Sequence, residues 1–367
     1  LIWHTTAKRL PKPTLQYAVG YTVYQQVAMA EDDTKSSSQK SSTKSSADCK
    51  KNGKAKKSTS KTLEATILDS SVEQMQPYTP PNGILPFNHS MITPELKKYA
   101  AEKLNETDDV REKAIEEFRQ LVINDPDLEV TDEDDLILLF LRSRKFDVKR
   151  AFDFMKLGLS YVESYRYILE REDPAIVRRV IKTNMIGFLP YRDAEGRAII
   201  YSRADCWNPD EVPAADCIFT GIMAVQSAGH NPVNQIAGFI VILDLKDLKV
   251  HQVLAMSRWM IFGAITLQRA CPCFMKAFHV INTPPFYKIG WKLVKPLLSE
   301  KIRKRFIFHK SSDLSTLYEF VPKEILPKEL GGPISFSNEH WAKDIDRIEK
   351  EYYYYLNHNC LRSKKKK

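Results

Sequence analysis

The side chains best suited to chemistry are basic residues crowded into one stretch, residues 285–310. This stretch holds eight basic side chains and a single acidic one, Glu300. From Phe286 its apolar residues are spaced as in an amphipathic helix. Lysines recur on the opposite side of that helix, at Lys288, Lys292 and Lys295. Such a helix is typical of a segment lying on an anionic membrane surface, or else of the solvated face of an ordinary domain.

The charge of this stretch contrasts with that of the chain around it. The 367 residues carry a formal net charge of +9. Residues 31–61 hold nine lysines and four acids, and residues 362–367 add five basic side chains and no acid. Residues 62–361 are net acidic, so residues 285–310 form a basic island that we predict to be a docking surface. A sequence-blind association of the two tails with nucleic acid is the weaker alternative, and we expect no specific nucleic-acid partner.

The sequence contains none of the common catalytic motifs. Gly-x-Ser-x-Gly, the P-loop, the dinucleotide fingerprint and His-Glu-x-x-His are all missing, and the eight histidines stand singly. Cys271-Pro272-Cys273 offers two thiols where a structural zinc site takes four ligands, so we expect a turn at a strand entry there. His230, near Ser227, has no visible acidic partner. We therefore expect no catalytic residue, no metal site and no cofactor.

Composition also bounds the compartment and the ends of the chain. Six cysteines with no paired spacing outside Cys271-Pro272-Cys273 suit a reducing compartment. No apolar run reaches the roughly eighteen residues of a membrane span, so the chain is expected to touch a membrane without crossing it. Met29-Ala30-Glu31 resembles a translation start, which makes residues 1–28 a leader, a cloning remnant or an alternative upstream exon. Residues 31–61 are predicted to be disordered and residues 62–93 irregular.

Two ordered regions and a C-terminal segment are predicted after residue 93. Helical periodicity predicts a small all-helical domain over residues 94–170, with Thr131 as the N-cap of its third helix. The helices expected there cover residues 95–105, 109–124, 132–144 and 148–169. Residues 341–367 are predicted to form a C-terminal helix and a basic tail.

Residues 171–340 alternate strands with helices and therefore predict an α/β architecture. Strands at 185–189 and 197–203 flank the turn signal Asp193-Ala194-Glu195-Gly196 and predict a hairpin. The continuous apolar run at 239–243 is typical of a strand buried on both faces of a parallel sheet. The remaining elements expected are helices at 214–229 and 254–268, a strand at 278–282 and the amphipathic helix from Phe286.

The helix at 214–229 is unusual in the small residues along one side, Cys217, Gly221, Ala224 and Ala228. Small side chains facing a sheet can leave a cavity, or they can allow close helix packing. Both readings stay open from composition alone.

Several ordered stretches together resemble the CRAL-TRIO (Sec14-like) lipid-binding family. They are Asp134-Asp135-Leu136, Phe140-Leu141-Arg142-Ser143-Arg144-Lys145-Phe146-Asp147, residues 238–245, Phe278-His279-Val280-Ile281-Asn282, Lys295-Pro296-Leu297-Leu298-Ser299-Glu300-Lys301 and Leu326-Pro327-Lys328-Glu329-Leu330-Gly331-Gly332. The resemblance covers roughly residues 95–340 and is strongest to the branch of alpha-tocopherol transfer protein, cellular retinaldehyde-binding protein and the clavesins.

The resemblance implies an all-helical N-terminal domain and a lipid-binding domain with a mixed, mainly parallel sheet flanked by helices. An apolar pocket would lie over this sheet and be closed by a gate helix. The pocket residues implied by position are Cys217, Ile218, Gly221, Ile222, Val225, Phe239, Val241, Leu243, Leu248, Phe262, Ile265, Phe286, Ile289 and Leu293. Cys217 and Gly221 stand where the tocopherol carrier has serines, which removes partners for a ligand hydroxyl.

The resemblance also implies a phosphoinositide site beside the gate. Arg144, Lys276, Lys301 and Arg305 match basic positions of the family, whereas a further family lysine falls on Phe274. Arg303 and Lys304 are close enough in sequence to compensate, and Lys304 is included in the expected site.

The implied function is non-enzymatic: binding and intracellular transfer of a hydrophobic ligand such as a tocopherol, a retinoid or a similar lipid, coupled to phosphoinositide-dependent docking on membranes. The expected protein is a cytoplasmic monomer that visits endosomal or other intracellular membranes. The alternative is a clavesin-type trafficking adaptor that reads phosphoinositides and holds lipid only as a structural filler.

Overall fold

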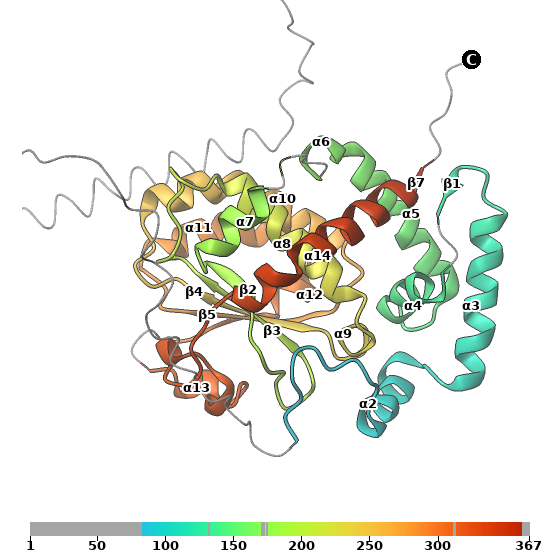
Figure 1. Ribbon diagram of the computed structural model, residues 1–367, viewed down its shortest axis with the longest axis horizontal. Coiled ribbons are helices and arrows are strands. Elements are labelled where there is room, and N and C mark those ends of the chain that lie inside the picture. Colours follow the sequence, from blue (N-terminus) through green and yellow to red (C-terminus); the bar gives the residue numbers. More distant parts are fainter. Residues whose placement is uncertain (1–82, 131–132, 170–172, 174, 311–312, 362–367) are drawn as a thin grey trace, which may run out of the picture.

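In this computed structural model the described residues are 83–130, 133–169, 173, 175–310 and 313–361. Their centre is a five-stranded sheet in the order β2-β3-β4-β5-β6 (Figure 1). Strands β2 and β3 are antiparallel and all other neighbours are parallel, which confirms the predicted hairpin and the mixed, mainly parallel sheet. The strands are β2 (Ile186–Phe188), β3 (Ala198–Arg203), β4 (Phe239–Asp244), β5 (Met275–Ile281) and β6 (Phe306–Phe308).

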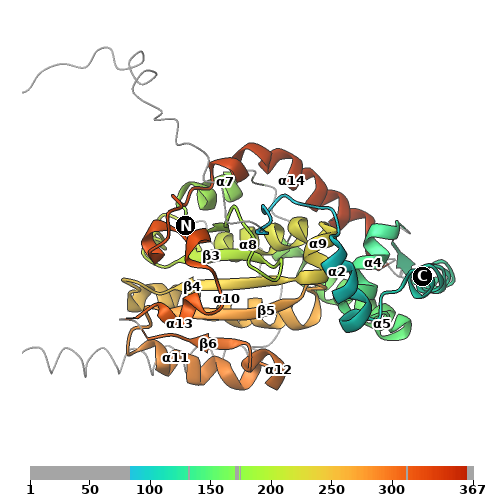
Figure 2. The same ribbon diagram turned by 90° about the horizontal axis from the view of Figure 1, so that it is seen from below.

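Helices cover the sheet, and Figure 2 shows α11 and α12 beside β6, away from α14 at the opposite side. They are α7 (Ala175–Lys182), α8 (Ala214–Gly229), α9 (Pro232–Ala237), α10 (Val250–Arg269), α11 (Tyr287–Val294), α12 (Glu300–Arg303), α13 (Ser315–Tyr318) and α14 (Glu339–His358). Helix α8 has the predicted bounds. Helix α10 begins at Val250 instead of residue 254, because the Gln252 side chain accepts a hydrogen bond from the Lys249 backbone N–H (2.7 Å) and caps an earlier start.

Strand β4 is buried on both faces, as its continuous apolar run predicted. Phe239 and Val241 face a core shared with α8 and α14. Ile240 and Ile242 face a second core, formed with apolar residues between 314 and 334. Successive side chains of a strand point to opposite faces, so a strand covered on both sides must be apolar throughout.

The helical N-terminal domain is present, with two differences from its prediction. Residues 95–105 form a short α-helix followed by a π-helical turn instead of one regular helix. Thr131 lies outside the described residues, and α4 begins after Glu133. The elements are α2 (Pro94–Tyr99), η1 (Ala100–Leu104), α3 (Asp108–Ile123), α4 (Asp134–Ser143), α5 (Val148–Ser164) and α6 (Arg166–Leu169).

A buried ionic contact ties this domain to the α/β domain. The guanidinium of Arg142, only 2% exposed, donates hydrogen bonds to both carboxylate oxygens of Glu106 (2.9 and 2.6 Å) and to the Gln235 amide oxygen on α9 (2.5 Å). A buried charge is tolerated when it is paired in this bidentate way. The contact fixes α4 against α9 and hence the orientation of the two domains.

The C-terminal helix α14 spans both domains. Its apolar side packs on Phe219 of α8 through residues such as Tyr352, whose hydroxyl donates to the Leu169 carbonyl (3.0 Å). After the helix, β7 (Cys360–Leu361) pairs with β1 (Leu128–Glu129) of the N-terminal domain. Residues 341–361 are therefore part of the folded body.

A pair of histidines is buried on the face of β5 away from α8. His279 is 1% exposed, and its Nδ1 lies 3.0 Å from Nε2 of His309, while its own Nε2 is buried without a hydrogen-bond partner among the described residues. Burial, with the neighbouring His309, lowers the pKa of His279 to about 4. Burial lowers the pKa of His309 as well.

We expect this pair to make the fold less stable in acid. The unfolded chain takes up a proton near pH 6.5 that folded His279 refuses until about pH 4. Stability is therefore complete above about pH 6.5 and falls as the pH drops towards 4, by about 3 kcal/mol. Urea unfolding across this range measures the slope. His279→Gln should flatten it, and His251→Gln, at an exposed position, should not; equal slopes in all three proteins would contradict the assignment.

Candidate functional site

A largely apolar cavity of about 320 Å³ lies between the two domains. Helix α8 forms one wall, α10 another, and α4 and α5 of the N-terminal domain close it. The lining side chains are Val130, Leu136, Leu139, Phe140, Met155, Leu159, Val162, Ile186, Cys217, Ile218, Ile222, Val225, Gln226, His230, Thr266, Leu267, Ala270, Cys271, Pro272, Cys273, Met275, Tyr355, Leu356 and Asn359, with glycines 158, 221 and 263.

Glycines on three helices keep this space open. A Cβ built at Gly221 would approach only the Ile186 Cδ1 within 4 Å, at 3.7 Å, and one at Gly263 would approach only the Ile218 Cδ1, at 3.7 Å. A Cβ at Gly158 would meet backbone atoms of residues 269 and 270 at 3.6 Å or more. The small residues of helix 214–229 were compatible with a cavity or with close helix packing. The structure shows a cavity.

The polar side chains of the cavity are few, and Thr266 and His230 already have partners. Thr266 donates to the Phe262 carbonyl (2.9 Å) and lies 2.9 Å from the Tyr161 hydroxyl. His230 stacks on Tyr355, with ring centroids 4.2 Å apart, and burial lowers its pKa, so it is a neutral wall residue near neutral pH. The cavity therefore offers little to a strongly polar ligand.

Only one group of the expected pocket residues lines this cavity, the α8 residues Cys217, Ile218, Gly221, Ile222 and Val225. The remaining residues lie elsewhere. Phe239 and Val241 are buried with Phe219 and Met223, whose large side chains fill space between the sheet and α8, and Leu243 packs against the same cluster. The cavity therefore reaches the sheet at Ile186 and Met275 and not at β4.

The α10 and lid residues expected in the pocket also lie outside the cavity. Phe262 packs between Tyr161 and Tyr165, and Ile265 contributes to the same cluster. Leu248 and Phe286 are half-buried in the segments before α10 and α11. The side chains of Ile289 and Leu293 are not among those that the structure describes.

Residues of α4, α5 and α14 complete the cavity, and the sequence did not point to them. Leu139, Met155 and Val162 belong to apolar stripes that predicted only the core of a helical domain. Gly158, within the α5 stripe, was the one available signal, because a glycine inside a buried helical face leaves a gap.

The segment matched to the gate lies on the far side of α10. Val294, Leu298 and Ile302 form a cluster with Met260 and Ala264 of α10. Leu267 packs against this cluster and also lines the cavity, so one α10 side chain separates the two. The outer face of the segment carries exposed Lys292 and Lys295. Helix α11 is thus the outermost layer over the cavity on this side.

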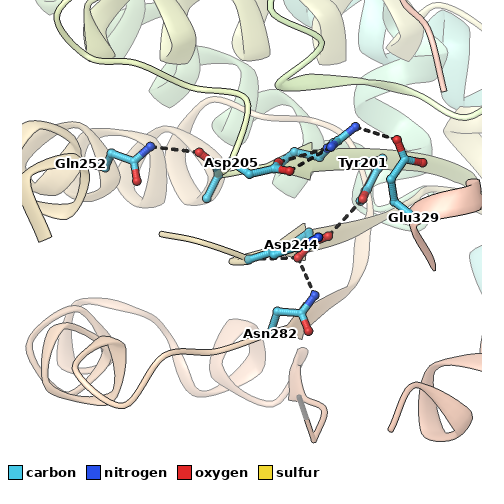
Figure 3. A network of polar contacts seen from close by, with 9 residues as sticks. Tyr201, Asp205, Asp244, Gln252, Asn282 and Glu329 are labelled. Carbon is cyan, nitrogen blue, oxygen red and sulfur yellow. Dashed lines mark hydrogen bonds and ion pairs between the residues drawn. The ribbon is translucent and has the colours of Figure 1, made fainter. Parts of the chain in front are cut away.

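A hydrogen-bonded network fixes the start of this lid (Figure 3). Asp244, at the end of β4, accepts from the Asn282 side-chain amide (2.8 Å) and from the Tyr201 hydroxyl (3.1 Å). Burial, and next the charge of Asp244, raise the pKa of Tyr201, so its hydroxyl remains a donor. Asn282 has a left-handed backbone (φ 51°) and directly precedes Thr283-Pro284-Pro285, which leads into α11. The segment that leads into α11 therefore starts from a fixed point.

Lys301 lies near four other basic residues. We call these five residues the basic cluster: Arg144, Lys145, Arg150, Lys301 and Arg305. Burial lowers the pKa of Lys301, and the positive charges of Arg305, Arg144, Lys145 and Arg150 lower it further. The guanidinium of Arg144 sits 3.4 Å from the centre of the Phe154 ring, and Arg305 donates to the Met275 carbonyl. Like charges held this closely favour a multivalent anion.

The other two residues expected in the phosphoinositide site have separate partners. Lys276 donates to the Tyr99 hydroxyl (3.1 Å), and its Nζ lies 4.6 Å from the centre of the Phe274 ring. Lys304 is exposed and forms an ion pair with Glu300 (2.7 Å). The structure thus brings together Arg144, Lys301 and Arg305, and adds Lys145 and Arg150, which were not expected.

Membrane-spanning helices and metal clusters are both missing from the described ranges. Every helix there is too short or too polar to traverse a lipid bilayer. No group of three or more His, Cys, Asp or Glu side chains suited to a metal ion occurs in this part of the chain.

Comparison with known proteins now identifies the fold. The CRAL/TRIO domain family matches residues 182–332. The chain is 28% identical over 269 residues to the human "Alpha-tocopherol transfer protein-like", covering 73% of this chain and 77% of that protein. It is 29% identical over 243 residues to the mouse protein of that name (66% and 71%), and 28% identical over 271 residues to human "Clavesin-2" (71% and 80%). Residues 182–332 therefore belong to the CRAL/TRIO domain family, and the chain as a whole is similar to these relatives.

Proposed function

We propose that the protein carries a hydrophobic lipid in the cavity between its domains and exchanges it at membranes that display phosphoinositides. The observation that carries the proposal is the adjacency of an apolar cavity and a basic cluster: Arg144 ends the helix α4 that lines the cavity, and its charge reaches Cys271 in the cavity wall. A cavity of about 320 Å³ is at the lower end of the usual range for small-molecule sites.

The energetics favour exchange over irreversible capture. Burial is worth about 0.8 kcal/mol per methylene, so a lipid of around twenty carbons gains on the order of 16 kcal/mol relative to water. A bilayer offers a similar gain. The direction of transfer is then set by docking and by the lid, and docking by four or five basic residues at roughly 1 kcal/mol each is transient.

The names of the relatives indicate the ligand class. Two of them are named alpha-tocopherol transfer protein-like. The cavity would offer a tocopherol few polar contacts, because Cys217 and Gly221 stand where the tocopherol carrier has hydroxyl-bearing residues. A tocopherol, a retinoid or a lipid of similar polarity fits this wall. We place the protein, as a monomer, at the cytoplasmic face of endosomal or other intracellular membranes, and assign it no catalytic activity in this role.

A transfer assay tests the proposal. Native mass spectrometry of the purified chain should show a bound lipid, and a fluorescent tocopherol analogue should move between vesicles faster when the acceptor contains phosphatidylinositol bisphosphate. Equal rates with phosphatidylserine acceptors of matched total charge would reject the phosphoinositide dependence. An empty protein that takes up neither tocopherol nor retinol would reject the carrier.

The clavesin relatives support a second candidate, a trafficking adaptor that reads phosphoinositides. The residues of the basic cluster do not line the cavity, so an adaptor role needs no lipid there. Delipidated protein that still binds phosphoinositide vesicles and reaches the same membranes in cells, without transfer activity, would favour the adaptor.

A further inference from the structure

Two of the three cysteines that line the cavity lie close together in the sequence. Cys271 and Cys273 stand on either side of Pro272, between the end of α10 and the start of β5, and both are only partly buried, whereas Cys217 lies on α8. The Cys273 sulfur lies 4.0 Å from the Val225 carbonyl oxygen on α8. Cys271 and Cys273 thus form part of the wall that a molecule in the cavity would face.

The environments of the two thiols differ in a way that favours reaction. Interaction with the Cys273 thiol, and to a lesser extent the charge of Arg144, lowers the pKa of Cys271 in spite of burial. The same interaction raises the pKa of Cys273. Burial instead raises the pKa of Cys206, and raises that of Cys217 to about 12. Cys271 is therefore the thiol closest to a nucleophilic thiolate among the described cysteines.

An inert role does not account for this pair. A structural zinc site needs more ligands than the two thiols provide, and none of the described residues supplies a third. Cys217 is instead buried on α8, where burial and the negative charge of Asp216 raise its pKa. Cys271 has a thiol partner, a cationic neighbour and an apolar chamber in front of it.

We propose that Cys271 and Cys273 form a redox-active dithiol that reduces lipid hydroperoxides held in the cavity. The proposal rests on the proposed function in one respect, the entry of a lipid into this cavity. Two neighbouring thiols supply the two electrons that cleavage of a peroxide bond requires, and the apolar wall selects a lipid over a small polar peroxide.

The reaction balances with the groups present. The Cys271 thiolate attacks the terminal peroxide oxygen, the O–O bond breaks, and the lipid alkoxide takes up a proton and leaves as an alcohol. Cys271 becomes a sulfenic acid. The Cys273 sulfur then attacks the Cys271 sulfur, its proton departs with the hydroxyl as water, and a disulfide forms. A small thiol such as dithiothreitol restores the dithiol by exchange.

Mass spectrometry of the reduced full chain tests this. The tryptic peptide between Arg269 and Lys276 contains both cysteines. Linoleic acid hydroperoxide should convert it to a form lacking two hydrogen atoms faster than it oxidises Cys206, because the pKa of Cys271 is lowered and that of Cys206 is raised. Cys273→Ser should stop at the sulfenic acid, which dimedone traps at Cys271. Cys206→Ser is the matched control and should react as the unaltered protein does.

The outcomes separate this proposal from the carrier function. If the protein takes up tocopherol but its tryptic peptide with Cys271 and Cys273 stays reduced, the proposed redox-active dithiol is overturned and the carrier function stands. A disulfide that forms no faster with linoleic acid hydroperoxide than with hydrogen peroxide would overturn the lipid peroxidase and count against lipid entry as well. Arg144→Gln should slow the first step, because it removes a charge that lowers the pKa of Cys271; an unchanged rate would remove Arg144 from the mechanism.

Discussion

Lys301→Glu combined with Arg305→Glu will abolish binding to vesicles that contain phosphatidylinositol bisphosphate. The two changes replace two positive charges of the basic cluster with two negative ones. At about 1 kcal/mol per charge near an anionic surface, the loss is about 4 kcal/mol, or roughly a thousandfold in affinity. Vesicle co-sedimentation at low and at physiological salt measures it, since screening weakens the interaction in the unaltered protein.

The control variant makes the same change in net charge at a different place on the surface. Lys328→Glu with Lys343→Glu alters two exposed lysines on η4 (Lys328–Leu330) and α14, outside the basic cluster, and should retain most of the phosphoinositide binding. Arg305 also donates to the Met275 carbonyl, so Lys301→Glu alone, at an exposed position, guards against an effect of misfolding and should cost about 2 kcal/mol. Equal losses in the double variant and the control would refute the site.

Gly221→Trp will leave the protein without a bound lipid. The position faces the cavity, and a Cβ added there would have only the Ile186 Cδ1 within 4 Å, at 3.7 Å, so the indole ring enters the space that the ligand would occupy. Replacing a glycine inside a helix also removes a destabilising residue, by about 1 kcal/mol, so the fold should tolerate the change. Native mass spectrometry and uptake of a fluorescent tocopherol analogue should both fall from full occupancy to background.

An indole added outside the cavity controls for this substitution. Ile123 on α3 is 60% exposed, and Ile123→Trp should load lipid normally. Thermal unfolding of both variants shows whether each is folded. A folded Gly221→Trp protein that still copurifies with lipid would place the ligand elsewhere, for instance under α11.

The fold could be predicted where the residues of a single segment indicate which of its faces are buried. The apolar run of β4 identified a strand covered on both faces, whereas the small residues of α8 were compatible both with a cavity and with close helix packing. The three-residue strand β6 was missed, because Phe306 and Phe308 sit among lysines and arginines whose charge dominates the local pattern. Short helices such as α7 carry too few turns for their periodicity to stand out.

The site was predictable only in part, because it is assembled from distant segments. Nothing in the spacing of residues places Arg144 beside Lys301; only the family resemblance joined them. The resemblance also placed Phe239 and Val241 in the pocket, where the volumes of Phe219 and Met223 decide otherwise. Whether a space between helix and sheet is filled depends on the sum of facing side-chain volumes, which a pattern of apolar positions does not report.

Helix α14 has a mechanical consequence for ligand passage. It packs on α8, and the strand β7 that follows it pairs with β1 of the N-terminal domain, so it connects the two domains. Separation of the domains on that side would break this connection and expose Tyr352. We therefore expect a ligand to pass on the opposite flank, where Val294, Leu298 and Ile302 pack on Met260 and Ala264 of α10.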